Sequence, residues 1–384
     1  MEQITRRKFV GGLAALPLAG GLAGLGEMET GEFVLVGTQT TGTSKGIYSY
    51  RLDPATGELR HVALAAQSDM PTFLALAPDG KSVFAVNEIE QFRGAKGGSV
   101  SSFVLDREVG KLRPVNQVAS GGGAPCNISV DHTGKCVFAA NYSGGSAASF
   151  KVQPGGGLSE IVSLLQYKGS GPNKERQDQP HAHRVTVSPD NRFVMVNDLG
   201  LDVIHIYKLD ASTAVLTAND PAEWRAAPGS GPRALQFHPN GKWAYCVTEM
   251  TSAVYVLRWD AERGALETVQ EISLLPRHHH GPTGASDIVL DKAGKFAYAA
   301  NRLDDFLVTF TVSADTGRLT LLERSSCGGK TPRHLALDRT GKWLLVANQL
   351  TDTIAIFGRD PETGRLAKAG KSFAISRPQC ILFA

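Results

Sequence analysis

The stretch 232-PRALQFHPNGKWAYCVTE-249 contains two short apolar strands joined by a tight turn, with opposite charges at the end away from that turn. Apolar and polar residues alternate on either side of Asn240-Gly241. The dipeptide Asn-Gly readily adopts the positive φ angles that a tight hairpin turn requires. Arg233 begins the first strand and Glu249 ends the second. The two charges therefore meet at the open end of the predicted hairpin.

The same hairpin pattern recurs along the chain, and each copy is followed by a second pair of strands. The copies are 71-PTFLALAPDGKSVFAVNE-88, 125-PCNISVDHTGKCVFAANY-142, 180-PHAHRVTVSPDNRFVMVND-198, 286-SDIVLDKAGKFAYAANR-302 and 332-PRHLALDRTGKWLLVANQ-349. A turn related to Gly-x-Leu marks the outer pair seven times, at Leu59, Leu112, Leu158, Leu216, Leu266, Leu319 and Leu366. A period of about 50 residues is typical of the four-stranded blades of a β-propeller.

The inner hairpins are one fewer than the outer ones, so the missing hairpin must come from the two ends of the repeat region. The segment 378-PQCILFA-384 resembles a first strand, and 33-FVLVGTQ-39 resembles a second strand. Pairing these segments would close the ring and remove its open edge. The sequence therefore predicts an all-β fold over residues 31–384, a seven-bladed β-propeller with four-stranded blades closed by the N- and C-terminal strands.

Residues 1–30 precede the repeats and have a different composition. Arg6 and Arg7 stand before a short, weakly apolar, glycine-rich run from Gly11 to Gly26. This pattern indicates a twin-arginine-type signal peptide and linker, and the alternative is a disordered tail. The signal predicts passage through the twin-arginine export machinery and a periplasmic or extracytoplasmic location. It also predicts no membrane attachment after signal removal, whereas a chain without a signal would be cytoplasmic.

Composition argues against several classes of function. The net charge is +3 over 384 residues, and no basic run lies beyond the N-terminus, which disfavours a nucleic-acid partner. Five irregularly spaced cysteines without a Cys-x-x-Cys pair indicate neither a disulfide framework nor a zinc site. The sequence also lacks a nucleophile elbow, a phosphate loop and a dinucleotide fingerprint, which disfavours serine-hydrolase, nucleotide and nicotinamide chemistry.

The propeller topology brings the first residues of each inner strand and the last residues of its partner to one mouth of the central channel. Strand starts contribute Asn127, His181, His183, Arg233, Arg333 and His334. Strand ends contribute Asn87, Glu88, Asn141, Tyr142, Asn197, Asp198, Glu249, Asn301, Arg302, Asn348 and Gln349. Two long irregular segments, residues 166–179 and 276–285, also enter at this mouth, either as covers of a site or as solvated loops.

These side chains suggest acid–base chemistry on an anionic substrate. An arginine fork fits a carboxylate or phosphate and stabilises developing oxyanion charge, and histidine transfers protons near neutral pH. Alternatively, Arg233 and Glu249 form only a structural ion pair. His181 and His183 are two apart on a strand and share one face. A metal would need a third ligand there, for which only Asp198 or Glu88 is a candidate, so we expect none.

Several stretches carry a resemblance to a known family. They are 36-VGTQTTGTSKGIYSYRLDPATGEL-59, 169-GSGPNKERQDQPHAH-183, 231-GPRALQFHPNGKWAYCVTE-249, 298-YAANR-302 and 328-GGKTPRHLALD-338. Together they resemble the seven-bladed propeller lactonases, the group of cycloisomerase-type 6-phosphogluconolactonases and fungal carboxy-muconate lactonising enzymes. The resemblance implies catalytic roles for His183, Arg233, Glu249 and Arg302, with no required metal or cofactor. The chain departs from the family at Asn127, Ala234 and Val289, where members often have histidine.

The resemblance implies a lactonase-like hydrolase that opens a small anionic or sugar-derived lactone at the channel mouth. The residues predicted to bind the substrate are His181, Asn127, Asn141, Asp198, Arg333 and His334. An exported member would meet an unphosphorylated lactone, because phosphorylated sugar lactones belong to the cytoplasm. Two alternatives remain, a non-catalytic exported propeller that binds a ligand or partner protein and a muconate-type lactonising cycloisomerase.

Overall fold

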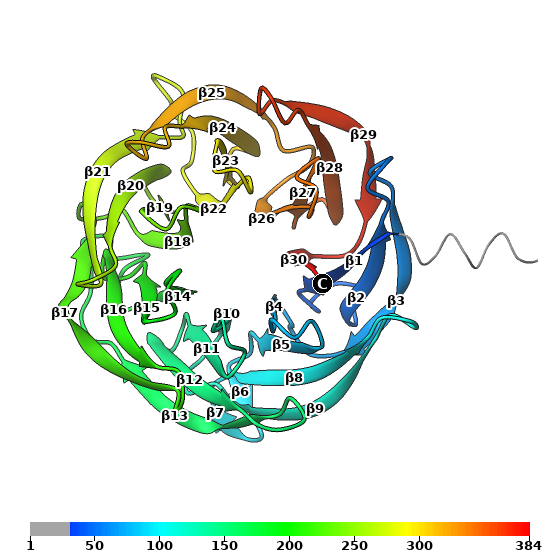
Figure 1. Cartoon of the computed structure of the whole chain (residues 1–384), viewed down its shortest axis with the longest axis vertical. Helices are drawn as coiled ribbons and strands as arrows, with labels where there is room; N and C mark the ends of the chain where they lie inside the picture. The colour runs from blue at the N-terminus through cyan, green and yellow to red at the C-terminus, as the bar shows by residue number, and fades with distance from the viewer. Residues whose placement is uncertain (1–30) are drawn as a thin grey trace, which may run out of the picture. The chain divides into compact units, whose positions relative to one another are not determined.

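The computed structural model describes residues 31–384, apart from the side chains of residues 368–371. Residues Glu32–Ala384 form one compact unit of seven four-stranded antiparallel sheets arranged in a ring (Figure 1). The predicted all-β, seven-bladed propeller is therefore confirmed. The predicted signal peptide, residues 1–30, lies outside the described residues. No helix within the described range is long and apolar enough to cross a membrane.

The blades are numbered in chain order. Blade 1 contains β1 (Glu32–Thr38), β2 (Gly46–Leu52), β3 (Leu59–Gln67) and β30 (Pro378–Phe383), and blade 2 contains β4 (Phe73–Leu76), β5 (Ser82–Asn87), β8 (Ser99–Asp106) and β9 (Lys111–Ala119). Blade 3 contains β10 (Pro125–Val130), β11 (Cys136–Asn141), β12 (Ser146–Val152) and β13 (Leu158–Gln166), and blade 4 contains β14 (Ala182–Val187), β15 (Phe193–Asp198), β16 (Val203–Asp210) and β17 (Val215–Arg225).

The remaining blades follow the same order. Blade 5 contains β18 (Pro232–Phe237), β19 (Trp243–Thr248), β20 (Ala253–Asp260) and β21 (Ala265–Ser273), and blade 6 contains β22 (Ala285–Leu290), β23 (Phe296–Asn301), β24 (Phe306–Val312) and β25 (Leu319–Ser326). Blade 7 contains β26 (Pro332–Leu337), β27 (Trp343–Asn348), β28 (Thr353–Arg359) and β29 (Leu366–Ala374). A two-stranded hairpin of β6 (Gln91–Phe92) and β7 (Ala95–Lys96) is inserted between β5 and β8.

The ring closes through β1 and β30, which come from opposite ends of the described chain (Figure 1). The two strands pair antiparallel, with Val34 opposite Phe383. Beyond the ladder, the amide of Ala384 donates a hydrogen bond to the carbonyl of Phe33 at 2.8 Å. The predicted closure by terminal strands is confirmed, and blade 1 has no open inner edge.

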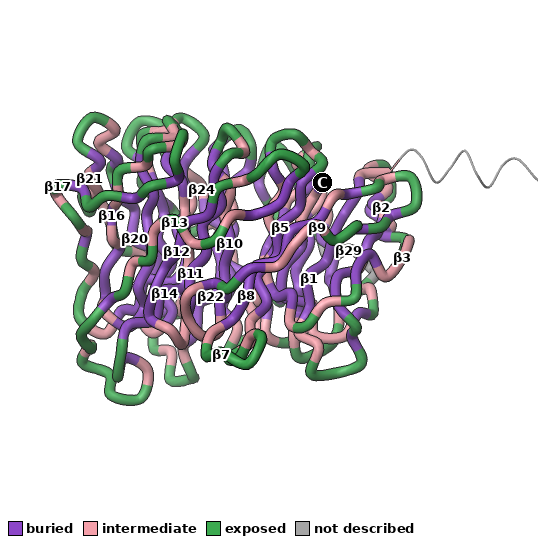
Figure 2. The backbone as a smooth tube through the Cα atoms, turned by 90° about the horizontal axis from the view of Figure 1, so that it is seen from below, coloured by how far each residue is buried: buried purple, intermediate pink, exposed green. Residues whose placement is uncertain are grey.

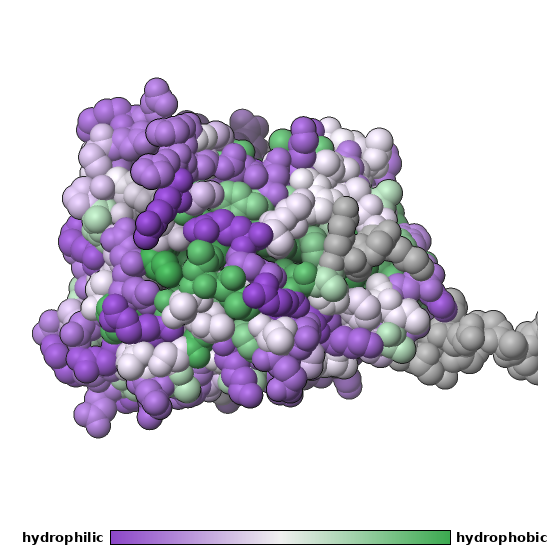
Figure 3. Space-filling model, turned by 90° about the horizontal axis from the view of Figure 1, so that it is seen from above, coloured by the Kyte–Doolittle hydropathy of each residue, from purple (hydrophilic) through white to green (hydrophobic). Residues whose placement is uncertain are grey.

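The apolar core is divided among seven clusters, each of which combines buried residues of two neighbouring blades. Tyr245 of blade 5 and Phe310 of blade 6, for example, are fully buried in the same cluster. Burying a side chain of this kind stabilises the fold by about 1.5–3 kcal/mol. Buried residues follow the strands and exposed residues follow the loops at both faces (Figure 2). On the wall in Figure 3, hydrophobic residues gather between two hydrophilic rims.

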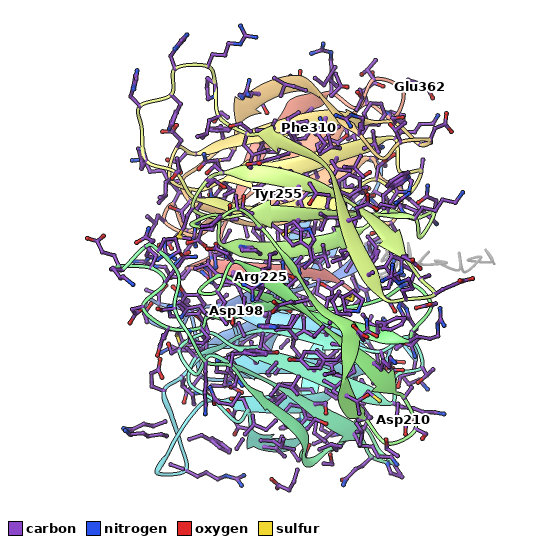
Figure 4. All side chains as sticks on the ribbon, turned by 90° about the vertical axis from the view of Figure 1, so that its left-hand side faces the viewer. Asp198, Asp210, Arg225, Tyr255, Phe310 and Glu362 are labelled. Carbon is purple, nitrogen blue, oxygen red and sulfur yellow. The ribbon has the colours of Figure 1, made fainter. Side chains whose placement is uncertain are left out.

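The two faces of the ring differ in what they contain. The turns of the inner hairpins lie on one face, and the turn of the opening hairpin has Gly241 at a φ of 69°, a conformation that favours glycine. Strand starts and second-strand ends lie on the other face. In Figure 4, Asp198 and Arg225, both at strand ends, lie towards one side, whereas Asp210 and Glu362 lie towards the opposite side. The residues predicted to meet at one mouth therefore share a face.

Candidate active site

A recurring irregularity of the innermost strands shapes the mouth of the channel. Six of the seven strands next to the channel skip one residue in their pairing with the next strand, which is a β-bulge. A bulge re-aims the side chain of the extra residue. The bulge residues are Cys126, His183, Arg233, Ser286, Arg333 and Gln379. All of them except Ser286 line a small chamber in the channel.

Three arginines from different parts of the ring converge on the carboxylate of Glu249, directly after β19. Its Oε2 atom lies 2.9 Å from Nε of Arg233 and 2.6 Å from Nη2 of Arg302. Its Oε1 atom lies 2.5 Å from Nη2 of Arg176. The side chains of Glu249 and Arg233 are only 2% and 4% exposed. The charges at the open end of the hairpin therefore form an ion pair, within a cluster of one carboxylate and three guanidinium groups.

The three arginines determine the charge of Glu249. Burial by itself raises the pKa of this carboxyl, but Arg302, Arg233 and Arg176 outweigh burial and lower its pKa to about 2. Both oxygens are occupied by guanidinium groups. Glu249 is therefore an ionised, fully engaged carboxylate, which suits it to holding the arginines in place. It is poorly suited to act as a base that activates water.

His183 occupies the bulge of β14 and contacts Tyr142, which follows β11. The two rings meet edge-to-face with centroids 5.9 Å apart. Burial, followed by repulsion from nearby arginines, lowers the pKa of His183 well below its usual value. The imidazole is therefore neutral near pH 7 and has a lone pair that can accept a proton. Its Nδ1 atom is buried without a hydrogen-bond partner among the described residues.

These groups surround an open cleft of about 210 Å³. Its lining residues are Glu88, Cys126, Tyr142, Arg176, His183, Glu249, Arg302 and Arg333. Within residues 31–384, the Arg333 side chain has no hydrogen bond or ion pair, and Oε2 of Glu88 is buried without a partner. Both groups therefore offer unused hydrogen-bonding capacity to a bound molecule. A larger groove of about 1020 Å³ lies between β3, β9 and the inserted hairpin, and no predicted site residue lines it.

The structure brings together four of the predicted residues at the cleft: His183, Glu249, Arg302 and Arg333. Arg233 lies beneath them and lines the chamber. It lies between Glu249 on one side and the carbonyl of Ser286 on the other, to which its Nη1 donates. Arg233 therefore orients Glu249 from below. Of the two arginines predicted to be catalytic, Arg233 and Arg302, only Arg302 faces the cleft.

Asn141 and Asp198 hydrogen-bond to nearby backbone groups, and Asn141 also to the side chain of Ser146. The side-chain Nδ2 of Asn141 donates to the carbonyl of Ser120 and to Oγ of Ser146, both at 3.0 Å. Oδ1 of Asp198 accepts from the amides of His181 and Gly200 at 2.8 and 2.9 Å. Neither residue lines the cleft. Their predicted part in substrate binding stays a prediction.

Asn127 and His334 line the chamber and also connect neighbouring blades. Oδ1 of Asn127 accepts from the amide of Val185 in the next blade at 3.0 Å. Nδ1 of His334 accepts from the amide of Ile381 at 3.3 Å. Burial is the main cause that lowers the pKa of His334 to about 4, so its ring is neutral near pH 7. Both residues therefore stabilise the innermost layer of the ring.

His181 supports the cleft from behind. Its ring stacks on Tyr142 with centroids 4.3 Å apart and an interplanar angle of 15°. The sequence predicted that His181 and His183 share one face because they are two apart on a strand. The structure places β14 from Ala182 and a bulge at His183, so simple alternation does not apply, although both rings contact Tyr142. Within residues 31–384, no group of three His, Cys, Asp or Glu side chains could hold a metal ion.

Arg176 was not among the predicted site residues, although its loop, residues 166–179, was predicted to enter at the mouth of the channel. Arg176 contacts Glu249 and donates through Nη2 to the hydroxyl of Tyr142 at 3.2 Å. Within the loop, the amides of Arg176 and Gln177 donate to the carbonyl of Asn173. The segment 166–179 therefore contributes to the site, whereas no residue of 276–285 lines the cleft. An arginine in a segment without strand periodicity offered no signal of where its side chain would lie.

Comparison with known proteins gives one matching family, several relatives and several similar solved structures. The family described as a 7-bladed β-propeller lactonase matches residues 33–383. A 6-phosphogluconolactonase of Bacillus subtilis is 35% identical over 294 residues, which cover 77% of this chain and 81% of that protein. A 6-phosphogluconolactonase of Formosa agariphila is 32% identical over 283 residues, which cover 72% and 78%. The solved structure of a periplasmic gluconolactonase of Pseudomonas aeruginosa has a TM-score of 0.86 at 34% identity, covering 92% of this chain and 98% of that chain.

Proposed function

Because the chain belongs to the family of seven-bladed β-propeller lactonases, we propose that it hydrolyses a small sugar-acid lactone in the cleft beside Glu249. The observation that carries this proposal is the arrangement of the cleft itself. A neutral, buried His183 faces the same 210 Å³ space as Arg302 and Arg333. A proton acceptor and cationic hydrogen-bond donors are the two requirements for adding water to an ester carbonyl.

His183 carries the proton through both halves of the reaction. The oxygen of water bonds to the lactone carbonyl carbon, while one water proton moves to the imidazole and the carbonyl oxygen becomes an oxyanion. The ring carbon–oxygen bond then breaks, and the ring oxygen takes the proton back from the imidazolium. The product is a hydroxy acid whose carboxyl ionises in solution. A histidine with a lowered pKa releases this proton readily, which favours the second step.

The arginines stabilise the oxyanion. Arg302 reaches Glu249 through Nη2, which leaves the rest of its guanidinium group for the cleft. Arg176 brings a second cation from the loop, and Arg233 holds the carboxylate of Glu249 from below. Donors fixed before the reaction need no reorganisation when charge develops, and this is a large source of rate enhancement. Glu249 is thus a positioning residue for the arginines.

Two groups in the cleft fit the polar substituents of a sugar-acid lactone. The unpaired carboxylate oxygen of Glu88 accepts hydrogen bonds from ring hydroxyls. The unpaired guanidinium group of Arg333 donates to hydroxyl or anionic oxygens. Relatives named 6-phosphogluconolactonase and periplasmic gluconolactonase support a sugar-acid lactone as the substrate class. We infer that the unphosphorylated lactone is the substrate if residues 1–30 direct export.

The test compares lactone hydrolysis by the wild type and by matched variants. Purified protein receives gluconolactone, 6-phosphogluconolactone or a muconolactone, and acid release is measured above the spontaneous rate; a separate assay supplies a muconate and measures lactone formation. His183→Ala and Arg302→Ala are each expected to lower the rate on the preferred lactone by about a hundredfold. Lys295→Ala, an exposed change on the opposite face, serves as the matched control and should leave the rate unchanged.

The outcomes separate the candidate functions. A wild type that is no faster than His183→Ala on any of the three lactones would refute the hydrolase and favour a non-catalytic binding propeller. Lactone formation from a muconate, without hydrolysis of either gluconolactone, would favour the cycloisomerase. Preference for 6-phosphogluconolactone would count against an exported role.

A further inference from the structure

Beneath the cleft lies a chamber of about 20 Å³ inside the ring of bulge residues. A cavity needs about 10–15 Å³ to hold one water molecule, so this chamber has room for one and no more. Cys126, His183 and Arg333 line both the cleft and the chamber, which makes them the wall between the two spaces. Thr72 and Gln379 line only the chamber, on the side formed by blades 1 and 2.

Besides Nε of Arg233, which lies 2.9 Å from Oε2 of Glu249, three polar atoms of the residues that line the chamber have no hydrogen-bond partner among residues 31–384. They are Nδ1 of His183, Oγ1 of Thr72 and Oε1 of Gln379. The three residues are only 8%, 2% and 2% exposed, respectively. Buried polar groups in folded proteins are nearly always hydrogen-bonded, to protein or to an ordered water. Three unpaired atoms around one water-sized space therefore point to a common ligand.

We propose that the chamber holds one water molecule, which binds Nδ1 of His183 and is held in turn by Gln379 and Thr72. The water accepts a hydrogen bond from the Nδ1 proton and donates its two protons to Oε1 of Gln379 and Oγ1 of Thr72. One molecule in this arrangement satisfies all three atoms. It makes three hydrogen bonds, which is the typical number for a buried water.

Other small ligands fit this chamber less well. An anion such as chloride has no proton to donate, so it would leave the amide oxygen of Gln379 unpaired. The orientation of that amide is set by its Nε2, which donates to the carbonyl of Pro378 at 3.3 Å. A cation would be repelled by Arg184, Arg233 and Arg333, which also line the chamber, because the carboxylate there, Asp287, is already paired with Arg184. Water is the ligand that can both accept from the imidazole and donate to the amide oxygen.

The water determines which nitrogen of His183 carries the proton. In a neutral imidazole one nitrogen carries the proton and the other is an acceptor, and the hydrogen bond made by the first sets this choice. With Nδ1–H held by the water, Nε2 presents its lone pair to the cleft. This is the form that removes a proton from an attacking water. The inference thus rests on the proposed function for its role in the reaction, while the water site itself stands on the geometry of the chamber.

Thr72→Val and Gln379→Met test the inference, because each removes a hydrogen-bonding atom at nearly constant volume. Each variant is expected to lower kcat for lactone hydrolysis about tenfold while KM stays within about twofold, since neither side chain lines the cleft. Thr72→Ser keeps the hydroxyl and is expected to restore most of kcat. Circular dichroism and thermal melting establish that each variant is folded. Equal losses in Thr72→Val and Thr72→Ser would overturn the role of the hydroxyl.

Two further measurements do not depend on activity. A crystal structure of the wild-type protein should show one ordered density peak within hydrogen-bonding distance of His183, Thr72 and Gln379. Nitrogen NMR of histidine-labelled protein should show His183 protonated on Nδ1, and the double variant Thr72→Val, Gln379→Met should lose this preference. An unfilled chamber or a proton on Nε2 would overturn the proposal. An ordered water in a protein without lactonase activity would refute the proposed function and leave the water site intact.

Discussion

At the scale of single residues, the charge balance of the cleft depends on Glu249. Its one carboxylate lies within 3 Å of three guanidinium groups, two of them largely buried. Removing one partner of a buried ion pair typically costs about 3–5 kcal/mol, because the remaining charge is buried without compensation. Glu249→Gln is therefore expected to lower the free energy of unfolding by about this amount and to abolish lactone hydrolysis. Urea unfolding at pH 7 measures the first effect.

Glu362→Gln is the matched control for that experiment. Glu362 is exposed in the turn after β28, on the face away from the cleft (Figure 4). Exposed substitutions of this kind usually change stability by less than about 0.5 kcal/mol. If Glu249→Gln were as stable as Glu362→Gln, the carboxylate of Glu249 would not hold the arginine cluster together, and its role as a positioning residue would be wrong.

His334 makes the stability of the fold depend on pH. Its pKa is lowered to about 4 in the folded protein, mainly by burial, whereas an unfolded chain has a histidine pKa of about 6.5. The unfolded state therefore binds the proton more readily as pH falls from 6.5 towards 4, and stability falls across this window. The titration of His334 lowers the free energy of unfolding by on the order of 3 kcal/mol at pH 4.

His334→Gln tests this prediction, because glutamine can still accept the amide hydrogen bond of Ile381 but does not titrate. Unfolding midpoints are compared at pH 7, 5.5 and 4.5. The variant is expected to show a shallower fall with decreasing pH than the wild type, whatever its stability at pH 7. Parallel curves for the two proteins would show that His334 does not titrate with the folded-state pKa assigned to it.

The sequence predicted some features of the site and missed others for identifiable reasons. It placed His183, Glu249 and Arg302 at one mouth, because strand starts and ends follow directly from the repeat. It did not separate Arg302, which faces the cleft, from Arg233, which lies below. That difference arises because Arg233 is a bulge residue, whereas Arg302 follows the end of β23. A one-residue bulge cannot be recognised from the alternation of apolar and polar residues along a strand.

At the scale of the strand, β30 completes blade 1 and supplies Gln379 to the chamber. Deleting residues 378–384 removes the neighbour of β1 and takes buried Cys380 and Ile381 from two core clusters. The truncated protein is expected to melt at least 10 °C lower than the full chain or to fail to fold, since losing several buried side chains costs several kcal/mol. Melting followed by circular dichroism measures this. Wild-type melting of the truncated chain would contradict closure of the ring as a source of stability.

Strand pairs were more predictable than the segments between them. The hairpin turns and the pairing of β1 with β30 could be predicted because Asn-Gly, Asp-Gly and alternating apolar residues recur at a fixed spacing. The inserted hairpin of Gln91–Phe92 with Ala95–Lys96 was not predicted, because two-residue strands have no periodicity. Asn141 and Asp198 were predicted to bind substrate because they are polar and lie near the mouth. In the structure both bind backbone groups, because main-chain amides and carbonyls at strand ends also need partners, and their role in substrate binding stays a prediction.

At the scale of the whole molecule, we propose that residues 1–30 direct export. The full chain is expected to appear in the periplasm of a host with a twin-arginine pathway. Changing both Arg6 and Arg7 to lysine is expected to retain it in the cytoplasm in folded, active form. Cell fractionation with lactone hydrolysis as the readout measures both outcomes. A chain that reaches the periplasm despite the double change, or remains in the cytoplasm without it, would refute the signal.

The pairing of β1 with β30 also governs the order in which the molecule can be finished during synthesis. Blades 3 to 7 each consist of consecutive strands, and blade 2 is interrupted only by the inserted hairpin of β6 and β7, so each can assemble as it leaves the ribosome. Blade 1 has to wait, because β1 is among the first strands made and β30 is made after all the others. Throughout that interval β1 presents an unpaired edge, which is a template for association with other chains. The last strand of the ring to be synthesised therefore removes an unpaired edge that has existed since β1 was made, and a nascent chain held just short of β30 should be the form most dependent on chaperones.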